Sequence, residues 1–184
     1  MERRLFLHFP LIASALVANA NNDKPGRRNK GFKVAANQDR YQEELFIMGG
    51  KFDCKVSSKD TDGALLIYDT VRHSKGGPAM HLHYSQDEWF YVIKGEFIVQ
   101  VGQEKFTLSA GDSAFAPRTI PHAFANISEG EGQMLVLFQP AGSMEDFFAQ
   151  MAKISKDVPK NQEETLKELW ATHGMKIVGP PLKF

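Results

Sequence analysis

The sequence predicts an all-β domain, a small antiparallel barrel or sandwich, followed by two C-terminal α-helices. Two observations support this fold class. From residue 41 to 139 the chain consists of short apolar or alternating runs separated by glycine- or proline-containing turns, as in β-sandwiches and barrels. After residue 140 the apolar residues instead recur at helical spacing. We therefore expect the β-domain at 41–140 and the helices with a closing segment at 141–184.

Size and charge limit the possible functions. The chain has 184 residues, which suits one domain with a sizeable core. Lysine plus arginine number 22 and aspartate plus glutamate also number 22, so no net charge draws the protein to nucleic acid. We expect a small-molecule substrate and no nucleic-acid partner. Cys54, the single cysteine, lies in an alternating stretch and is expected to be a half-buried structural thiol.

The first residues differ from the domain. Residues 1–20 combine a basic start, a short apolar run and a small-residue ending, which is the layout of a secretory signal. Arg3 and Arg4 resemble the core of a twin-arginine export signal. We expect export to the periplasm or the exterior, with a cytoplasmic location as the alternative, and no membrane span in the mature chain. Residues 21–40 are polar and are expected to form a linker or N-terminal arm.

The strands are predicted from apolar runs bounded by turn residues. The predicted strands are 44–48, 51–57, 64–71, 88–93, 97–101, 105–109, 113–117, 122–127 and 134–138. An exposed edge strand needs protection, so residues 43–48 are a candidate for pairing with a second copy in a homodimer.

Two helices are predicted after the β-domain. Ser143 followed by Asp146 is typical of a capping box, and Phe147, Met151 and Ile154 then repeat at helical spacing. A second helix is expected to start at Asn161, to end at Gly174, and to place Leu166, Leu169 and Trp170 on one face. Both apolar faces are expected to pack on the core. Residues 177–182 would then form an extended closing segment.

One stretch, MHLHYSQDEWFYVIKG, carries candidate metal ligands. His81 and His83 are two residues apart, so in a strand they share one face. Glu88 follows a short turn, and its strand is expected to run back beside the first as a hairpin. Two imidazoles and a carboxylate would suit Fe, Mn, Co, Ni, Cu or Zn better than calcium or magnesium. A solvated strand face is the alternative.

A second stretch, GDSAFAPRTIPHAFAN, favours the metal site. Together the two stretches resemble the paired motifs of the cupin superfamily. The first motif is matched by His81, His83, Glu88 and Gly95, and the second by Gly111, Pro117, His122 and Asn126. Two glycines of the family pattern are absent. The first motif would have a glycine at Lys75, whereas here Gly76 and Gly77 lie one and two positions later. In the second motif, Thr119 stands where the family has a glycine after the proline.

The resemblance implies a small antiparallel jelly-roll barrel with one divalent transition metal near its mouth. His81, His83, Glu88 and His122 would be the ligands, and Glu88 would also be the catalytic base. On strand parity, Phe90, Phe97 and Phe124 would line the interior around a substrate. His8, His73 and His173 lie outside the motifs and are not expected to bind metal.

Single-domain cupins with this ligand set and trailing helices resemble quercetin 2,3-dioxygenase-like proteins. The resemblance implies a metal-dependent dioxygenase, an oxidoreductase acting on a small aromatic or enolic compound. Two other readings stay open. The metal could serve only as a Lewis acid in an isomerase or lyase, or the protein could bind a small molecule without turnover.

Overall fold

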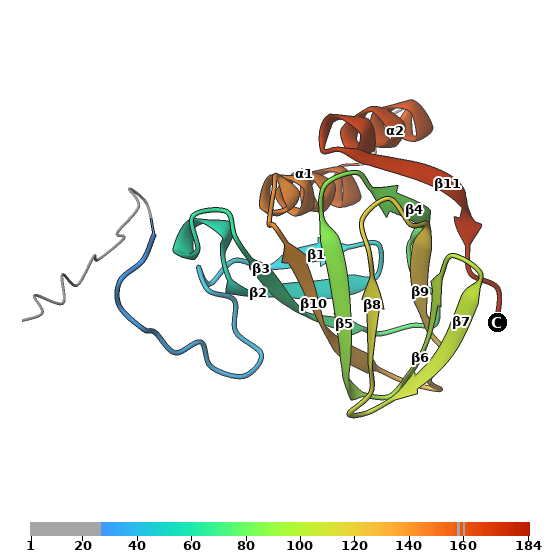
Figure 1. The fold of residues 1–184 in the computed structure, drawn as a ribbon, viewed down its shortest axis with the longest axis horizontal. Helices are drawn as coiled ribbons and strands as arrows, with labels where there is room; N and C mark the ends of the chain where they lie inside the picture. Colours follow the sequence, from blue (N-terminus) through green and yellow to red (C-terminus); the bar gives the residue numbers. More distant parts are fainter. Residues whose placement is uncertain (1–26, 158, 160) are drawn as a thin grey trace, which may run out of the picture.

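The structure is a computed structural model that describes residues 27–157, 159 and 161–184. Two antiparallel sheets face each other and enclose the core, and two helices lie at one end of this barrel (Figure 1). The mostly β architecture with C-terminal helices confirms the predicted fold class, and it is consistent with a jelly-roll barrel.

The first sheet has six strands in the order β1-β2-β3-β10-β5-β8. Their bounds are β1 Leu45–Ile47, β2 Gly50–Val56, β3 Leu66–Arg72, β5 Asp87–Lys94, β8 Ser113–Ala116 and β10 Gly132–Gln139. β1 is shorter than predicted because Met48 and Gly49 turn the chain with positive φ angles of 48° and 79°. β1 lies at the edge of this sheet, and its pairing with a second copy stays a prediction.

The second sheet has five strands in the order β11-β4-β9-β6-β7. Their bounds are β4 Ala79–His83, β6 Glu96–Val101, β7 Glu104–Ser109, β9 His122–Asn126 and β11 Met175–Pro181. The closing segment is thus a strand of the sheet. It pairs with β4, with Met175 opposite His83 and Ile177 opposite His81.

The expected hairpin between the strands of His83 and Glu88 is wrong. β4 pairs with β11 and β9, whereas β5 pairs with β10 and β8 in the opposite sheet. The chain therefore crosses between sheets at residues 84–86, where the amide of Tyr84 donates to the carbonyl of Gly174. The inward parity of the candidate ligands was still right: His81, His83 and Glu88 are all buried.

The helices are α1 Met144–Lys156 and α2 Gln162–Thr172, and a short 3₁₀ helix, η1, covers Ser58–Asp60. α1 buries Met144, Phe147, Phe148 and Met151, and α2 buries Leu169 and Trp170. The predicted capping box is wrong. Ser143 makes no side-chain cap hydrogen bond; instead its hydroxyl lies 2.9 Å from Nδ1 of the buried His173 at the end of α2. This contact joins the start of α1 to the end of α2.

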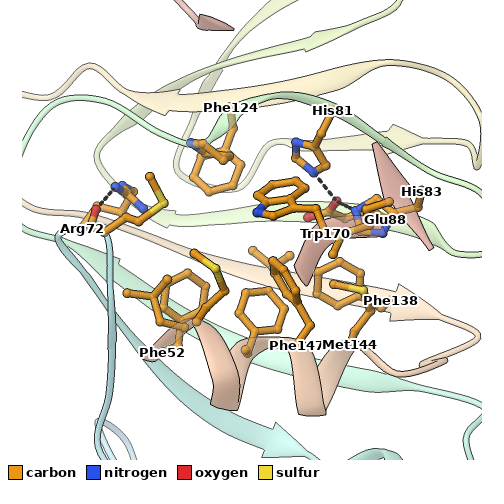
Figure 2. A pocket seen from close by; sticks show the side chains of 17 residues that line it. Phe52, Arg72, His81, His83, Glu88, Phe124, Phe138, Met144, Phe147 and Trp170 are labelled. Atoms are coloured by element: carbon orange, nitrogen blue, oxygen red, sulfur yellow. Dashed lines mark hydrogen bonds and ion pairs between the residues drawn. The ribbon is translucent and has the colours of Figure 1, made fainter. Parts of the chain in front are cut away.

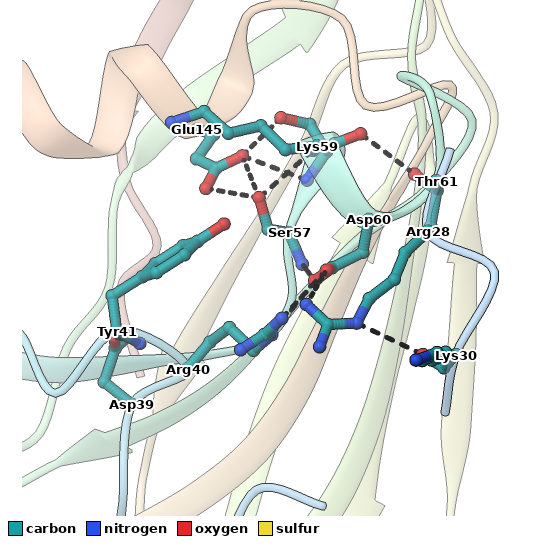
Figure 3. A network of polar contacts seen from close by, with 11 residues as sticks. Arg28, Lys30, Asp39, Arg40, Tyr41, Ser57, Lys59, Asp60, Thr61 and Glu145 are labelled. Atoms are coloured by element: carbon teal, nitrogen blue, oxygen red, sulfur yellow. Dashed lines mark hydrogen bonds and ion pairs between the residues drawn. The ribbon is translucent and has the colours of Figure 1, made fainter. Parts of the chain in front are cut away.

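A polar network fixes the start of α1 against the first sheet (Figure 3). Glu145, in the first turn of α1, accepts hydrogen bonds from the hydroxyl of Ser57 at 2.8 Å and from the amide of Ser58 at 2.9 Å. Asp60, at the other end of η1, forms an ion pair with Arg40 at 3.0 Å. Because these groups are mostly buried, the network holds the helix at one position over the barrel end.

Cys54 lies on β2 beneath this network and is fully buried, more so than predicted. Burial raises the pKa of the Cys54 thiol above its ordinary value, with the nearby Glu145 and Asp39 acting in the same direction. The thiol therefore stays protonated and behaves as a small apolar core residue.

The expected export signal at residues 1–20 lies outside the described residues, so export stays a prediction. Among the described helices, none is long and apolar enough to cross a membrane.

The departures from the family's glycine pattern have a structural explanation. A Cβ at Gly77 would overlap the backbone carbonyl of Phe124, so only glycine allows this loop to lie against β9. Gly76 pairs with Asn126 through two backbone hydrogen bonds of 2.9 Å. The buried amide of Asn126 also donates to the carbonyls of Ser74 and Gly130. The two loops are thus bound together at this end of the barrel.

We predict that Gly77→Ala lowers the free energy of unfolding by about 2–3 kcal/mol, because backbone must move to admit the methyl group. The melting temperature would fall by about 5–10 °C. The matched control is Gly130→Ala, since a Cβ there meets nothing within 4 Å and its φ is not positive. Equal melting temperatures for the two variants would contradict the close approach.

Candidate metal centre

Four side chains from three strands and both sheets meet inside the barrel. β4 supplies His81 and His83, β9 supplies His122, and β5 supplies Glu88 from the opposite sheet. One potential ligand atom from each lies within 4.8 Å of the others, and all four residues are buried. The register explains the convergence, because His81 pairs directly with His122 across β4 and β9. The four predicted ligands are therefore brought together.

Glu88 is at the centre of the cluster. Its Oε2 lies 2.8 Å from Nε2 of His122, 3.2 Å from Nε2 of His83 and 3.9 Å from Nε2 of His81. Figure 2 shows His81, His83 and Glu88 at one end of a cavity, with Trp170 beside them. The imidazole Nε2 atoms thus all face one carboxylate oxygen.

Two backbone carbonyls set the orientation of the imidazoles. Nδ1 of His81 lies 2.8 Å from the carbonyl of Ala79, and Nδ1 of His122 lies 2.9 Å from the carbonyl of Ile120. A carbonyl can only accept, so in each ring Nδ1 carries the hydrogen and Nε2 is directed to the centre. Such a second hydrogen bond is the usual support of a metal-binding histidine.

The ionisation of the cluster follows from burial and from its internal charges. Burial alone would raise the pKa of Glu88, but the hydrogen bond with His122 and the closeness of the His83 imidazole hold it below the usual range. Burial would lower the pKa of His122, but its bond to Glu88 raises it. Burial, together with the charge of His122, lowers the pKa of His81 to about 3. Glu88 is thus ionised and His81 neutral at pH 7, as metal binding requires.

The donor set fits a divalent transition metal. Three imidazoles and one carboxylate are borderline ligands, suited to Fe, Mn, Co, Ni, Cu or Zn. His83 supports this fit, because both of its ring nitrogens are buried without a hydrogen-bond partner among the described residues. A buried polar atom without a partner is unfavourable, and a metal ion at Nε2 would satisfy it.

Two contacts outside the cluster position the ligand-bearing segments. Asp87, next to Glu88, accepts hydrogen bonds from the backbone amide of Arg118 at 2.8 Å and from its Nη2 at 2.6 Å. The amide of Thr119 donates to the carbonyl of His83 at 2.7 Å. Thr119 stands where the family pattern has glycine and keeps a left-handed φ of 68°. The turn geometry is therefore retained, at some strain for a β-branched residue.

A cavity of about 60 Å³ extends from the metal cluster under the two helices. Its wall is largely aromatic and apolar, and only Met48 and Pro78 among its lining residues are not buried. The lining residues are Ile47, Met48, Phe52, Arg72, Pro78, His81, His83, Glu88, Phe124, Val136, Phe138, Met144, Phe147, Phe148, Met151, Trp170 and Met175.

The three phenylalanines predicted to line the interior differ in position. Phe124 lines the cavity, whereas Phe90 and Phe97 are fully buried and are not among its lining residues. The ring centroid of Phe90 lies 5.7 Å from that of Phe124 and 6.3 Å from that of His122. Strand parity places all three side chains inside the barrel, as predicted. Phe90 and Phe97, however, pack in the filled part of the core behind the residues that line the cavity.

The sequence reasoning did not identify two cavity residues. Trp170 was expected to pack on the core, but its ring also lies edge-on to His81, with centroids 4.8 Å apart. Arg72 was not singled out, although it follows Leu66, Tyr68 and Thr70 at alternate positions of β3 and is buried as they are. Strand parity could have identified Arg72.

Comparison with known proteins supports the cupin superfamily. Residues 70–138, which include all four candidate ligands, match the cupin domain family Cupin_2. An RmlC-like cupin from Shewanella frigidimarina is 25% identical, with a TM-score of 0.51 over 66% of this chain and 98% of that chain. KdgF from a Halomonas species is 23% identical, with a TM-score of 0.50 over 60% of this chain and 94% of that chain, which shows the shared fold.

Curated relatives are similar over the same part of the chain. The uncharacterized protein MJ1618 of Methanocaldococcus jannaschii is 31% identical over 67 residues, covering 36% of this chain and 54% of that protein. The chain thus spans about half the length of the curated relatives it matches.

We predict that His122→Ala lowers the affinity for a divalent transition metal by at least about tenfold, because one of the buried donors is removed. Metal content would be measured by elemental analysis after purification without added metal, with and without a competing chelator. His73→Ala is the control, since His73 is exposed and pairs with the surface residue Glu131. Equal metal content in both variants would contradict the site.

We predict that Asp87→Asn lowers the melting temperature at pH 7 slightly, because the variant loses a partly exposed ion pair with Arg118. The hydrogen bonds from Arg118 lower the pKa of Asp87 to about 2 in the folded protein. The ion pair therefore contributes its full stabilisation of the fold at pH values above about 4, which is the pKa of an aspartate in the unfolded chain. The difference between variant and wild type would vanish as pH falls from 4 to 2.

The control for this measurement is Glu129→Gln, whose carboxylate pairs with Lys75 but is 95% exposed. Its melting temperature would match that of the wild type at every pH. A pH-independent effect of Asp87→Asn would show that the ion pair is not the cause.

Proposed function

We propose that this protein is a metal-dependent cupin enzyme, a dioxygenase acting on a small enolic or aromatic compound. The observation that supports this is the buried three-histidine, one-glutamate cluster open to an aromatic cavity. A bound redox-active metal would supply open coordination positions for dioxygen and for an oxygen atom of the substrate.

Glu88 is proposed to move the substrate proton. Its low pKa keeps the carboxylate ionised, the form that accepts a proton. Oε2 faces the imidazole Nε2 atoms, so an enolic hydroxyl placed among these atoms would lie within hydrogen-bonding reach of Glu88. His83 and His122 favour the charged form of Glu88, and the proton would therefore be held only transiently.

The apolar walls are proposed to exclude water and to orient the substrate. Trp170, Phe138 and Met144 close the cavity over the cluster, and each is buried. Charges interact more strongly where water is excluded, so a substrate anion would be stabilised there.

The cavity volume limits the substrate. About 60 Å³ is room for about four or five water molecules, far below the 300–1,000 Å³ of typical sites for drug-sized ligands. A three-ring flavonol therefore does not fit the cavity as it stands. A slim enol, diketone or single-ring compound is the better substrate candidate, which sets this protein apart from a quercetinase in the strict sense.

A non-redox isomerase or lyase is the alternative function, because the cupin barrel supports several chemistries and the same ligands suit zinc. Glu88 would then exchange protons with a substrate polarised by the metal.

Oxygen consumption separates these functions. Protein loaded with Fe, Mn, Co, Ni or Cu would be mixed without oxygen with acetylacetone, catechol and related enols, and oxygen would then be admitted. We predict oxygen uptake matched to substrate loss, and a fall of at least about 100-fold in rate for Glu88→Gln. The control is His73→Ala, which leaves the barrel interior unchanged.

Turnover that persists in zinc-loaded protein under nitrogen would contradict the dioxygenase and support the isomerase or lyase. Retention of a small molecule without turnover under either condition would contradict both enzymes.

A further inference from the structure

A buried arginine lies at the opposite end of the cavity from the metal cluster. The Arg72 side chain points into the cavity from the end of β3, as Figure 2 shows. The residue is 6% exposed. Met48, an exposed lining residue, belongs to this end, because Nη2 of Arg72 donates to the carbonyl of Met48 at 2.7 Å. Arg72 thus lies just inside the cavity mouth.

The guanidinium lacks a counter-charge. Among the described residues, no carboxylate lies within ion-pairing distance of it, and its Nε is buried without a hydrogen-bond partner. The ring of Phe124, 5.9 Å from the guanidinium carbon, is its aromatic neighbour. Arginine remains protonated in proteins, so this is a buried positive charge with one carbonyl as its hydrogen-bond acceptor among the described residues.

Stability does not explain this arginine. A buried unpaired charge destabilises a fold, and an apolar residue of similar volume would serve the core better. Glu88 is the one acidic residue that lines the cavity, and the three histidines hold it at the other end. The missing counter-charge therefore points to a ligand.

We propose that Arg72 binds a carboxylate of the substrate, so that the substrate is a slim amphipathic carboxylic acid whose other end reaches the metal cluster. A carboxylate suits the planar fork of a single guanidinium. A phosphate dianion would leave excess negative charge, since no second lysine or arginine lines the cavity. That this anion belongs to a substrate rests on the proposed function, whereas anion binding by Arg72 does not.

The strand register gives the shape of the ligand. On β10, Phe138 pairs with Glu88 and Gly132 pairs with Arg72, six residues apart. The backbones of Glu88 and Arg72 are therefore separated by about 20 Å along the strand direction. The distance between their charged groups is shorter, because both side chains reach into the cavity. Phe52, Phe124 and Phe147 line the space between them. A ligand that touches both ends must be elongated, with an apolar body.

Binding of matched carboxylates and amides tests the proposal. Acetate and butyrate would be compared with acetamide and butyramide on zinc-loaded, full-length protein, by calorimetry and without oxygen chemistry. We expect butyrate to bind about tenfold or more tightly than its amide, because a hydrogen-bonded charge pair replaces an unpaired charge. Arg72→Met would remove this preference, and Lys167→Met, which deletes an exposed charge on α2, would retain it.

The Nε–H resonance of Arg72 provides a second readout in the wild type, identified by its loss in Arg72→Lys. It would shift on addition of butyrate and stay in place with the amide, so the test does not depend on the folding of Arg72→Met. If no carboxylate is preferred over its amide, or if the preference survives in Arg72→Met, the proposal is overturned.

This test can fail independently of the proposed function. Arg72-dependent carboxylate binding without oxygen uptake would support the anion site and contradict the proposed dioxygenase activity. Oxygen uptake with an enol, together with equal binding of the carboxylate and its amide by the wild type, would support the dioxygenase and contradict the anion site.

Discussion

The structure depends on one constraint, which is that an ionised carboxylate lies at the centre of a closed apolar barrel. Such a charge is tolerated only when it is paired and hydrogen-bonded. Glu88 meets this requirement through three imidazoles that reach it from the facing sheet. The rings of His81 and His122 are held in turn by backbone carbonyls, so the positions of these two ligands are fixed by strand geometry as well as by their neighbours.

The surroundings of the cluster serve the same constraint. β11 pairs with β4 behind His81 and His83, and the bond from Thr119 to His83 links the turn before β9 to β4. α1 and α2 close the barrel over the cluster, and Glu145 fixes α1 to the first sheet through Ser57 and Ser58. The result is a cavity with largely apolar walls and an ionised group at each end. The carboxylate and its imidazoles lie at the inner end, and the guanidinium of Arg72 lies near the mouth.

Much of this arrangement could be predicted from the sequence. Strand parity placed His81 and His83 on one face, and the resemblance to the paired cupin motifs implied that Glu88 and His122 join them. The hairpin was wrong for a physical reason. A short turn between two strands has the same sequence signals whether the strands pair or cross to facing sheets, and only the partners β9, β10 and β11 decide it. The capping box at Ser143 failed because His173, distant in sequence, competes for the hydroxyl. Arg72 could be placed inward by parity, but its lack of a counter-charge is a property of the folded cavity.

The most direct test of the central claim is a crystal structure of the purified protein with anomalous scattering recorded at the absorption edge of its metal. The account predicts one metal ion per chain, about 2.0–2.2 Å from Nε2 of His81, His83 and His122 and from a carboxylate oxygen of Glu88. A metal bound elsewhere, or a fully loaded protein in which any of these side chains turns away from the ion, would contradict it.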